Sequence, residues 1–429
     1  MKKKCAIVGI GNRTHSWLSG IVEQHPECTQ LVGLCDLNLD RCRDVNAAYG
    51  TTAAVYDNYD RMLAEVKPDL VIVVSPESCH REHIVKALEA GCHVATEKPL
   101  CTTIEDADAI VAAERRSGKK VFMAFNYRHI PLCSKIREII KAGTIGRPVS
   151  MDLTWYLDYK GHGASYFRRW HRLMRESGGL LITKACHHFD LANWWMDDIP
   201  QTVFAQGRRN FFGPGHNPYQ GERCSTCAHS HECEWYTDVC IKDRTEELSR
   251  ELGYRVKGVR EYIRDYCPFG EDVDIHDTMA VQVGYRNGGI LNYSLNASVP
   301  FEGWNLAING TKGRLESKIT DAKPSPPWLP AEFQRKHEGR DVEWPDEYRI
   351  FVMPHQKAAF EVTVPNIAEG HGGGDFKIFD AALAGIYPEE DSLNIFASAI
   401  HGARSTAIGA GANASIASGQ PVHLKDWSF

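Results

Sequence analysis

The chain contains 429 residues, of which 43% are hydrophobic and 24% charged, and its formal net charge is −6. A chain of this length can bury large cores in two or three domains, and its acidic balance argues against a nucleic-acid partner. No apolar run approaches the roughly 20 residues that a membrane span needs. The N-terminal residues lack the long apolar region of a signal peptide, so the sequence predicts a cytoplasmic protein.

The first 125 residues alternate between apolar strands and helical patterns. A run such as residues 69–74, which is almost entirely apolar, is typical of a parallel strand buried on both faces. Parallel strands joined by crossover helices predict a doubly wound sheet of the α/β class. The expected strands are residues 4–10, 31–35, 53–55, 69–74, 91–94 and 121–125.

A glycine turn, Gly9-Ile10-Gly11-Asn12-Arg13-Thr14, follows the first expected strand and precedes a helical pattern. Such glycines let backbone amides approach a pyrophosphate at a helix N-terminus, although Thr14 stands where the dinucleotide fingerprint has its third glycine. Asp36 ends the second strand, where a carboxylate accepts hydrogen bonds from a ribose and repels a 2′-phosphate. The pattern predicts NAD rather than NADP, and the nearby Arg41 and Arg43 leave NADP open. The alternative is a glycine turn that binds no nucleotide.

A second polar stretch, Glu97-Lys98-Pro99, follows the strand expected at residues 91–94. Ligands of an open α/β sheet bind at the carboxyl ends of its strands. A partly desolvated lysine at that edge has a lowered pKa and can exchange protons with a ligand. The alternative is a salt bridge on the surface at a strand end.

A third polar stretch runs from Ser177 to Asp190. The pair Gly178-Gly179 opens a helical pattern that continues to Trp195, and on such a helix Lys184, His187 and His188 share a face because they are three or four residues apart. A cation, two imidazoles and a carboxylate are costly to bury unless they meet a ligand or one another. We therefore expect a functional cluster, whereas a lone histidine would more often be a core residue.

Several of these motifs stand in the order found in the Gfo/Idh/MocA oxidoreductases, the family of glucose–fructose oxidoreductase and inositol dehydrogenase, which this chain resembles. The motifs are Gly9-Ile10-Gly11, Asp36, Ser75-Pro76 with His80, Glu97-Lys98-Pro99 and Asn126-Tyr127-Arg128. The resemblance implies a Rossmann domain over residues 1–125. It implies a substrate and oligomerisation domain of the α+β class over residues 126–429, with a large open, mainly antiparallel sheet.

The resemblance also implies roles for individual residues. Lys98 is expected beside the nicotinamide and the reacting carbon, and Asn126 near the nicotinamide. The cofactor-binding residues that we expect are Gly9, Gly11, Asn12, Arg13, Asp36, Ser75, Pro76, His80, Glu97, Lys98 and Asn126.

The third stretch departs from the common pattern of the family. The family motif Asp-x-x-x-His-x-x-Asp aligns its histidine with His187 and its later aspartate with Asp190, but Thr183 stands at its first aspartate. The chain resembles instead a subgroup that reads Lys-x-x-His-His-Phe-Asp, so we expect Lys98 to carry more of the proton transfer. The expected catalytic residues are Lys98, His187 and Lys184, and the expected substrate-binding residues are Tyr127, Arg168, His171, Asp190 and His371.

After residue 130, the spacing of apolar residues predicts a helix at 131–143 and a strand at 149–159. Further strands are expected at 280–285, 290–295, 305–308 and 310–316. Residues 369–375 contain four glycines that permit a close approach to a ligand, and His371 and Asp375 could bond sugar hydroxyls. The alternative is a turn before a helix at 376–384. Residues 393–418 predict a pair of alanine-rich helices.

Residues 201–278 are expected to be an insertion, and they carry the spacing Cys224-x2-Cys227-x5-Cys233 in a polar loop. Thiolates at such spacing suit a tetrahedral zinc ion. Similar family members carry the same three cysteines and a later Cys-x-Phe/Tyr, which corresponds to Cys267-Pro268-Phe269. We expect a structural zinc site of Cys224, Cys227, Cys233 and Cys267, with Cys240, His229 or His231 as substitutes. The alternatives are free thiols, a disulfide or a four-cysteine iron–sulfur cluster.

The sequence therefore predicts an NAD-dependent oxidoreductase that transfers hydride between a secondary hydroxyl of a sugar, glycoside or cyclitol and nicotinamide. The alternative within the family is a lyase-type glycosidase that reduces and reoxidises its NAD in each cycle through a keto-sugar. A non-catalytic dinucleotide-binding sensor is disfavoured because Lys98 and His187 are both present. The nucleotide fingerprint argues against a lone sugar-binding module. We expect a homo-oligomer, formed through the open sheet, that binds neither membrane nor nucleic acid.

Overall fold

The computed structural model describes residues 2–237, 264–321, 347–367, 372–385 and 391–427. These residues form two compact units, which are considered one at a time. The first unit contains residues 2–130 together with 367, 372–385 and 391–407. The second contains residues 131–237, 264–321, 347–366 and 408–427. His371 and Cys240, both named as candidates from the sequence, lie outside the described residues.

The first unit is built on a parallel sheet of six strands in the order β3-β2-β1-β4-β5-β6. This order confirms the doubly wound sheet expected from the sequence, and it reverses between β1 and β4, where such folds bind their ligands. The strands are β1 (Lys3–Val8), β2 (Thr29–Cys35), β3 (Ala54–Tyr56), β4 (Leu70–Val73), β5 (His93–Thr96) and β6 (Val121–Met123).

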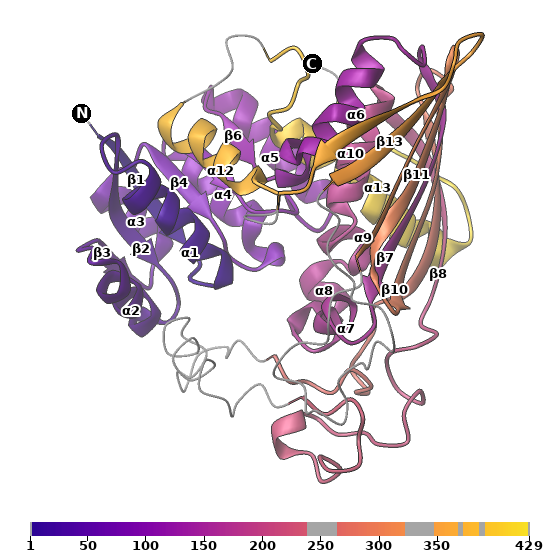
Figure 1. The fold of residues 1–429 in the computed structure, drawn as a ribbon. Helices are drawn as coiled ribbons and strands as arrows, with labels where there is room; N and C mark the ends of the chain where they lie inside the picture. Colours follow the sequence, from indigo (N-terminus) through magenta and orange to yellow (C-terminus); the bar gives the residue numbers. More distant parts are fainter. Residues whose placement is uncertain (1, 238–263, 322–346, 368–371, 386–390, 428–429) are drawn as a thin grey trace. The chain divides into compact units, whose positions relative to one another are not determined.

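Helices that cross between these strands begin at polar caps. This holds for three of them: the side chains of Asn38, Asn58 and Thr103 accept hydrogen bonds from backbone amides in the first turns of α2, α3 and α5, whereas α1 and α4 have no side-chain cap. Gly50 and Gly118 end α2 and α5 in the left-handed conformation. The helices are α1 (Asn12–Ser19), α2 (Leu39–Tyr49), α3 (Tyr59–Val66), α4 (His80–Glu89) and α5 (Ile104–Ser117) (Figure 1).

A segment near the C-terminus also belongs to the first unit. It contains α12 (Gly374–Phe379) and a π-helical turn, η7 (Asp380–Ala384). Phe379 and Leu383 are buried in the same apolar core as Trp17, and the Phe379 ring centroid lies 4.9 Å from that of Trp17. The Lys3 ammonium donates to the carbonyl oxygen of Leu383 at 2.6 Å. A domain boundary at residue 125 leaves this C-terminal segment out of the first unit. The segment joins that unit by packing against residues far away in the sequence, which no local pattern indicates.

The second unit is built on a nine-stranded sheet in the order β14-β13-β12-β11-β7-β10-β9-β8-β15. All neighbours pair antiparallel except β7 and β10, which are parallel, so the expected open, mainly antiparallel sheet is confirmed. The strands are β7 (Pro148–Asp158), β8 (Pro200–Arg208), β9 (Thr278–Tyr285), β10 (Ile290–Val299), β11 (Glu302–Gly310), β12 (Gly313–Asp321), β13 (Glu347–Pro354), β14 (Phe360–Pro365) and β15 (Val422–His423).

Helices α6 (Pro131–Lys141) and α10 (Cys186–Met196) lie along one face of this sheet (Figure 1). The short helices α7 (His162–Phe167), α8 (Met174–Ser177) and α9 (Leu180–Thr183) precede α10. The C-terminal helix α13 (Ala399–Ser418) is single, so the expected helix pair is wrong. No helix among the described residues is long and apolar enough to span a membrane.

Two further expectations need correction. Residues 200–208 are strand β8, so the insertion begins after Arg208 rather than at residue 201. The helix expected from Gly179 to Trp195 is broken at Lys184 and Ala185, between α9 and α10. Lys184 closes α9 with a backbone φ of −110°, and the Ala185 amide bonds back to the Leu180 carbonyl oxygen at 2.8 Å. Lys184 and His187 therefore do not share one continuous helical face.

Candidate functional site

Two glycines shape the turn between β1 and α1, and a different constraint acts at each position. Gly9 has a φ of +85°, and a Cβ there would lie 2.5 Å from the backbone of Ser75 at the end of β4. A side chain at Gly9 is therefore excluded by both conformation and space. Gly11 has an ordinary extended conformation, and a Cβ there would meet no described heavy atom within 4 Å. The surface over Gly11 is open, as a turn that receives a ligand must be.

Thr14, which replaces the third glycine of the fingerprint, holds this turn together. Its hydroxyl accepts a hydrogen bond from the Gly11 amide at 2.9 Å and donates to the Gly9 carbonyl oxygen at 3.2 Å. Asp36, at the end of β2, accepts from the Ile10 amide at 2.7 Å. Its other carboxylate oxygen accepts from the Asn38 amide at 2.9 Å. Two backbone amides thus fix the carboxylate beside the turn.

Arg13, in the first turn of α1, binds two buried carboxylates. Its Nε donates to Glu97 Oε1 at 2.8 Å, and Nη1 and Nη2 donate to the two oxygens of Asp375 at 3.1 and 3.0 Å. Trp17 Nε1 also donates to Glu97 Oε1, at 3.1 Å. Burial alone would lower the pKa of Arg13, but the charges of Glu97 and Asp375 raise it above its usual value. We call this set of Arg13, Glu97, Asp375 and Trp17 the Arg13 clamp.

The Arg13 clamp shows what three candidate residues contact within the chain. Arg13 and Glu97, both expected to contact the cofactor, bind each other. Asp375, named as a possible partner of sugar hydroxyls, is engaged by Arg13 through both carboxylate oxygens. These contacts stabilise the charges, because buried charges are stable only when they meet an opposite charge. The expected contacts with cofactor and sugar stay predictions.

Lys98 follows the clamped Glu97 and is half-buried. The Glu97 amide donates to the Val73 carbonyl oxygen at 2.9 Å, which aligns the end of β5 with β4. On the other side of Lys98, His80 Nδ1 lies 2.7 Å from the Pro99 carbonyl oxygen. The backbone of Lys98 is therefore held before and after the residue, and the Lys98–Pro99 peptide bond is cis.

His80 is buried, and its second ring nitrogen, Nε2, lies 2.9 Å from the Ser75 carbonyl oxygen. Both ring nitrogens thus meet backbone carbonyl oxygens, so His80 links the segment after β4 to Pro99. The Ser75 hydroxyl pairs with His83 Nδ1 at 2.9 Å. Burial, with a smaller effect of His80, lowers the pKa of His83 to about 4, which leaves it neutral at pH 7. Pro76, next to Ser75, is half-buried.

Asn126 begins the short helix η3 (Asn126–His129) and is buried. Its Nδ2 donates to Asp375 Oδ1 at 2.9 Å, so the Arg13 clamp extends to this side chain. Its Oδ1 is buried and has no hydrogen-bond partner among the described residues. A buried acceptor without a partner is costly, so its natural complement is a donor from a bound molecule. Tyr127, the next residue, is half-buried.

In the second unit, Lys184 and the paired histidines of α10 are buried beside an aromatic layer of the large sheet. His188 stacks on Trp155 with ring centroids 3.7 Å apart, and its Nδ1 pairs with the Tyr293 hydroxyl at 2.7 Å. The Lys184 ammonium lies 5.8 Å from the centroid of the Trp155 ring. His188 is thus bound into the core of the unit, which singles out His187 as the reactive candidate of the pair.

Sequence reasoning missed the partners that surround this cluster. His162 Nδ1 pairs with Glu302 at 2.6 Å, and its Nε2 pairs with the Tyr166 hydroxyl at 3.1 Å. Burial and then the charge of Lys184 lower the pKa of His162, against the opposing effect of Glu302. His162 and Glu302 come from α7 and β11, far apart in the chain, so no local spacing could have linked them. Asp190 is buried within α10.

Arg168, expected to bind substrate, faces the cysteine-rich insertion instead. Its Nη1 donates to Cys224 Sγ at 3.3 Å and its Nη2 to the Trp235 carbonyl oxygen at 2.6 Å. His171 is buried between Trp170, on which it stacks with centroids 4.5 Å apart, and Tyr166, which it meets edge to face. Arg168 is therefore withdrawn from the substrate-binding set.

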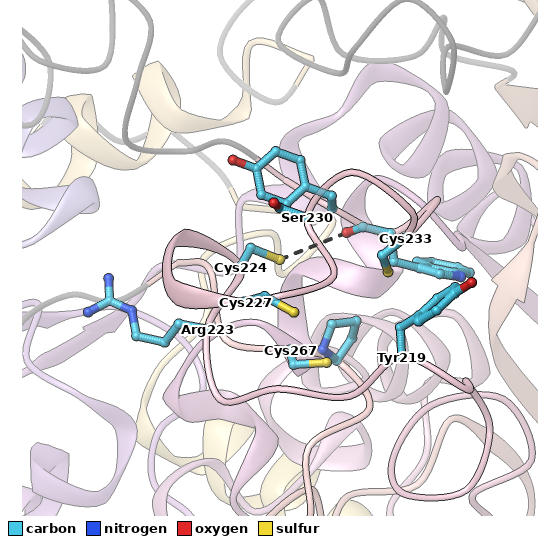
Figure 2. A pocket seen from close by; sticks show the side chains of 10 residues that line it. Tyr219, Arg223, Cys224, Cys227, Ser230, Cys233 and Cys267 are labelled. Carbon is cyan, nitrogen blue, oxygen red and sulfur yellow. Dashed lines mark hydrogen bonds between the residues drawn. The ribbon is translucent and has the colours of Figure 1, made fainter.

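The four expected cysteine ligands, Cys224, Cys227, Cys233 and Cys267, line one pocket of the insertion (Figure 2). None of the described cysteines forms a disulfide. The substitutes His229 and His231 are not among the lining residues. The structure thus brings together side chains that lie up to 43 positions apart, from Cys224 to Cys267.

Comparison with known proteins gives matches over the whole chain. Residues 3–125 match the model of an oxidoreductase family with an NAD-binding Rossmann fold, and residues 137–424 match that family's C-terminal alpha/beta domain. The chain is 36% identical to the protein YteT of Bacillus subtilis, over 99% of this chain and 98% of that one. It is 36% identical to D-glucoside 3-dehydrogenase of Escherichia coli over 33% of this chain and 40% of that protein.

Among solved structures, the chain resembles a levoglucosan dehydrogenase in complex with NADH and levoglucosan. The TM-score is 0.67 at 17% identity, and the match covers 99% of this chain and 100% of the other. At this level of identity the likeness concerns the fold.

Replacing Arg13 tests the Arg13 clamp. Arg13→Gln leaves two buried carboxylates without their counter-charge, and we expect it to lower the free energy of unfolding by about 3 kcal/mol, the low end for a broken buried pair because Arg13 is partly exposed. Arg43→Gln is the matched control, since its pair with Asp40 is exposed and is worth less than about 1 kcal/mol. Urea unfolding at pH 7 measures both. Equal losses in the two variants would contradict the clamp.

Proposed function

Because the chain belongs to the Gfo/Idh/MocA family of oxidoreductases, we propose that it oxidises a secondary hydroxyl of a sugar, glycoside or cyclitol with NAD. Relatives with related names support this substrate class: a D-glucoside 3-dehydrogenase and a myo-inositol 2-dehydrogenase are among the similar proteins. In the reaction the carbinol carbon loses a hydride and the hydroxyl loses a proton, which leaves a ketone. Bound NAD supplies the hydride acceptor.

The first unit has features that fit a dinucleotide. The open space over Gly11 and the first amides of the eight-residue helix α1 suit a pyrophosphate. Asp36 is held beside this turn and retains lone pairs for a ribose hydroxyl. The buried Asn126 Oδ1 suits the amide donor of a nicotinamide carboxamide. These three features, spaced along the carboxyl edge of one sheet, are the observation that carries the cofactor proposal.

We assign the removal of the hydroxyl proton to Lys98, with His187 as the alternative. Lys98 stands at the carboxyl end of β5 between two fixed residues, Glu97 in the Arg13 clamp and Pro99 bound by His80. A side chain on such a fixed base can meet a substrate without reorganising its backbone. His187 is buried next to His188, which the Tyr293 bond keeps in the core.

Lys184, Tyr127, His171 and Asp190 remain the proposed contacts for the other hydroxyls of the substrate. Lys184 offers donors beside the Trp155 and His188 rings. Apolar faces with a few placed polar groups are typical of small-molecule sites, and a polyhydroxylated ring offers both kinds of surface. Net oxidation is preferred over the NAD-recycling glycosidase because the similar proteins with named reactions are dehydrogenases.

Lys98→Met tests the catalytic assignment. We expect NADH formation on a panel of glycosides and inositols to fall by at least about 100-fold in kcat/KM, because a positioned acid or base contributes that much. NAD affinity, measured by titration, should fall by much less than kcat/KM, because Lys98 is only one of the eleven residues expected to contact the cofactor. Lys86→Met is the matched control: Lys86 lies on α4 in the same unit, where its ammonium pairs with the exposed Asp60 and Glu82. Unchanged turnover in Lys98→Met would refute the assignment.

The cofactor preference has its own test. We expect NAD to bind at least about 10-fold more tightly than NADP, since the carboxylate of Asp36 repels a 2′-phosphate. Asp36→Asn keeps an acceptor for the Ile10 amide but removes the charge. It should therefore reduce the difference in affinity between NAD and NADP, mainly by improving NADP binding. Titration of both nucleotides against both proteins measures this. Tighter NADP binding by the unaltered protein would contradict the role of Asp36.

A further inference from the structure

The cysteine-rich insertion is organised by two arms of backbone that pair with each other. Arg223 and Tyr266 form an antiparallel bridge. Beside it, the Cys224 amide donates to the Asp265 carbonyl oxygen at 2.8 Å, and the Cys267 amide donates to the Glu222 carbonyl oxygen at 2.9 Å. This pairing brings Cys224 and Cys267 near each other, diagonally across the bridge, although their separation along the chain is large.

Each arm then turns so that its cysteines line the same pocket. Cys224 to Thr226 form the 3₁₀ turn η5, and the Cys227 amide bonds back to the Cys224 carbonyl oxygen at 3.2 Å. After Cys267 the chain turns again, with the Gly270 amide bonded to the Cys267 carbonyl oxygen at 3.1 Å. Two such turns, each presenting cysteine at its start, are how a chain offers several thiolates to one ion.

A buried aromatic cluster supports the pocket from one side. Trp235 lines the pocket and packs edge to face against Phe269, with centroids 5.2 Å apart, and against Phe212 at 5.9 Å. Phe212 in turn stacks on Phe167 of α7 at 4.2 Å. The pocket is therefore anchored on the second unit, and Cys233, two residues before Trp235, is held with it.

A buried cation lies against the pocket. The Arg168 guanidinium donates to Cys224 Sγ at 3.3 Å and is buried. The Arg172 guanidinium is also buried and donates to the Cys267 carbonyl oxygen at 3.0 Å, and its charge is paired with Asp272. A buried cation is expensive unless negative charge balances it, and a cluster of four thiolates on a divalent ion would give Arg168 that negative charge.

We propose that Cys224, Cys227, Cys233 and Cys267 bind one zinc ion in a closed structural site. Each thiol gives up its proton to solvent as its sulfur binds the ion, and no electron is transferred. A tetrahedral ion with zinc–sulfur bonds of about 2.3 Å places the sulfurs about 3.8 Å apart. Among the described residues, no three of these sulfurs lie within 4.8 Å of one another, so binding would draw them together around the ion.

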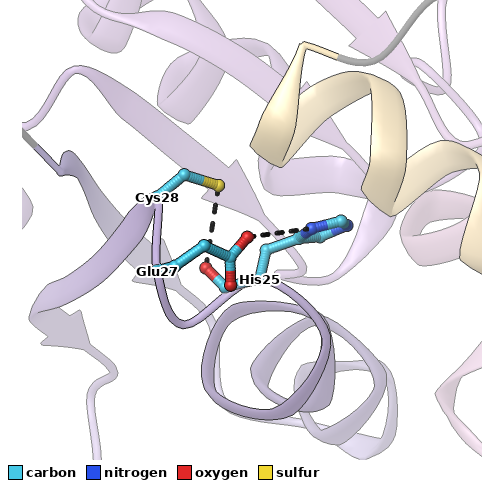
Figure 3. A group of neighbouring side chains, drawn as sticks. All are labelled: His25, Glu27 and Cys28. Atoms are coloured by element: carbon cyan, nitrogen blue, oxygen red, sulfur yellow. Dashed lines mark hydrogen bonds and ion pairs between the residues drawn. The ribbon is translucent and has the colours of Figure 1, made fainter.

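The insertion is favoured over another group of metal-ligating side chains. Among the described residues, the three ligand atoms found within 4.8 Å of one another belong to His25, Glu27 and Cys28 (Figure 3). These residues share one short turn, and His25 Nε2 is already bound to Asp380 Oδ1 at 3.1 Å. Glu27 is largely exposed. Hydrogen bonds within the turn account for this group without an ion.

The experiment measures metal in the purified full-length protein. We expect about one zinc per chain by elemental analysis, and X-ray absorption at the zinc edge should give sulfur ligands only, at about 2.3 Å. The double variant Cys227→Ser/Cys267→Ser should lose the metal. Cys28→Ser, which removes a thiol from the rival group, is the matched control and should keep it. Alkylation of the native protein should modify the four pocket cysteines only after a chelator has removed the metal.

Several results would overturn the proposal, including ones that do not depend on a variant folding. These are unaltered protein without zinc, nitrogen or oxygen ligands in the absorption spectrum, and ready alkylation of all four cysteines before metal removal. Either a disulfide among the four cysteines or bound iron with visible absorbance would contradict a zinc site there. Loss of zinc in Cys28→Ser would move the site to His25. None of these readouts depends on the substrate or on NADH formation.

Discussion

The contact of Arg13 with Glu97 and Asp375 is the constraint on which the first unit depends. It joins the start of α1, the end of β5 and the first turn of α12, which are distant in the sequence. Asp375 also accepts a hydrogen bond from Asn126, so the contact fixes that side chain. Glu97 directly precedes Lys98, so the contact also fixes the chain beside the lysine. The two residues proposed to face the nicotinamide and the substrate thus stand on one network of buried charge. That network includes two residues, Arg13 and Glu97, that are also expected to contact the cofactor.

In the second unit, aromatic packing rather than buried charge fixes the candidate residues in place. Trp155, His188 and Tyr293 bind the start of α10 to the large sheet, and His187 is the member of the pair that we propose to be reactive. A separate aromatic cluster around Trp235 anchors the insertion. In the sequence, Arg168 lies between Trp155 and Trp235. Its side chain contacts the insertion, where it donates a hydrogen bond to Cys224. Catalytic and structural roles are thereby divided between neighbouring residues of one stretch.

The sequence predicted the six parallel strands, the glycine turn and the grouping of Cys224, Cys227 and Cys233, because each has a local signal in periodicity or spacing. Cys267 has no such signal and was expected only from the resemblance to the family. The sequence did not predict the return of residues 372–385 to the first unit or the pairing of Asp375 with Arg13, because both depend on contacts between distant segments. The break between α9 and α10 was also missed, since a helical pattern of residues continues through Lys184. His80 was recognised as important, but its role as a bridge between backbone carbonyl oxygens required coordinates.

The most direct test of the central claim follows the hydride itself. Glycosides and inositols deuterated at their carbinol carbons are incubated with the protein and NAD, and the nicotinamide product is analysed by mass spectrometry. Oxidation of a secondary hydroxyl predicts NADH that carries one deuterium and a keto product in equal amount. Release of sugar from a glycoside without accumulation of labelled NADH would contradict it and would identify the reaction as one that recycles its cofactor.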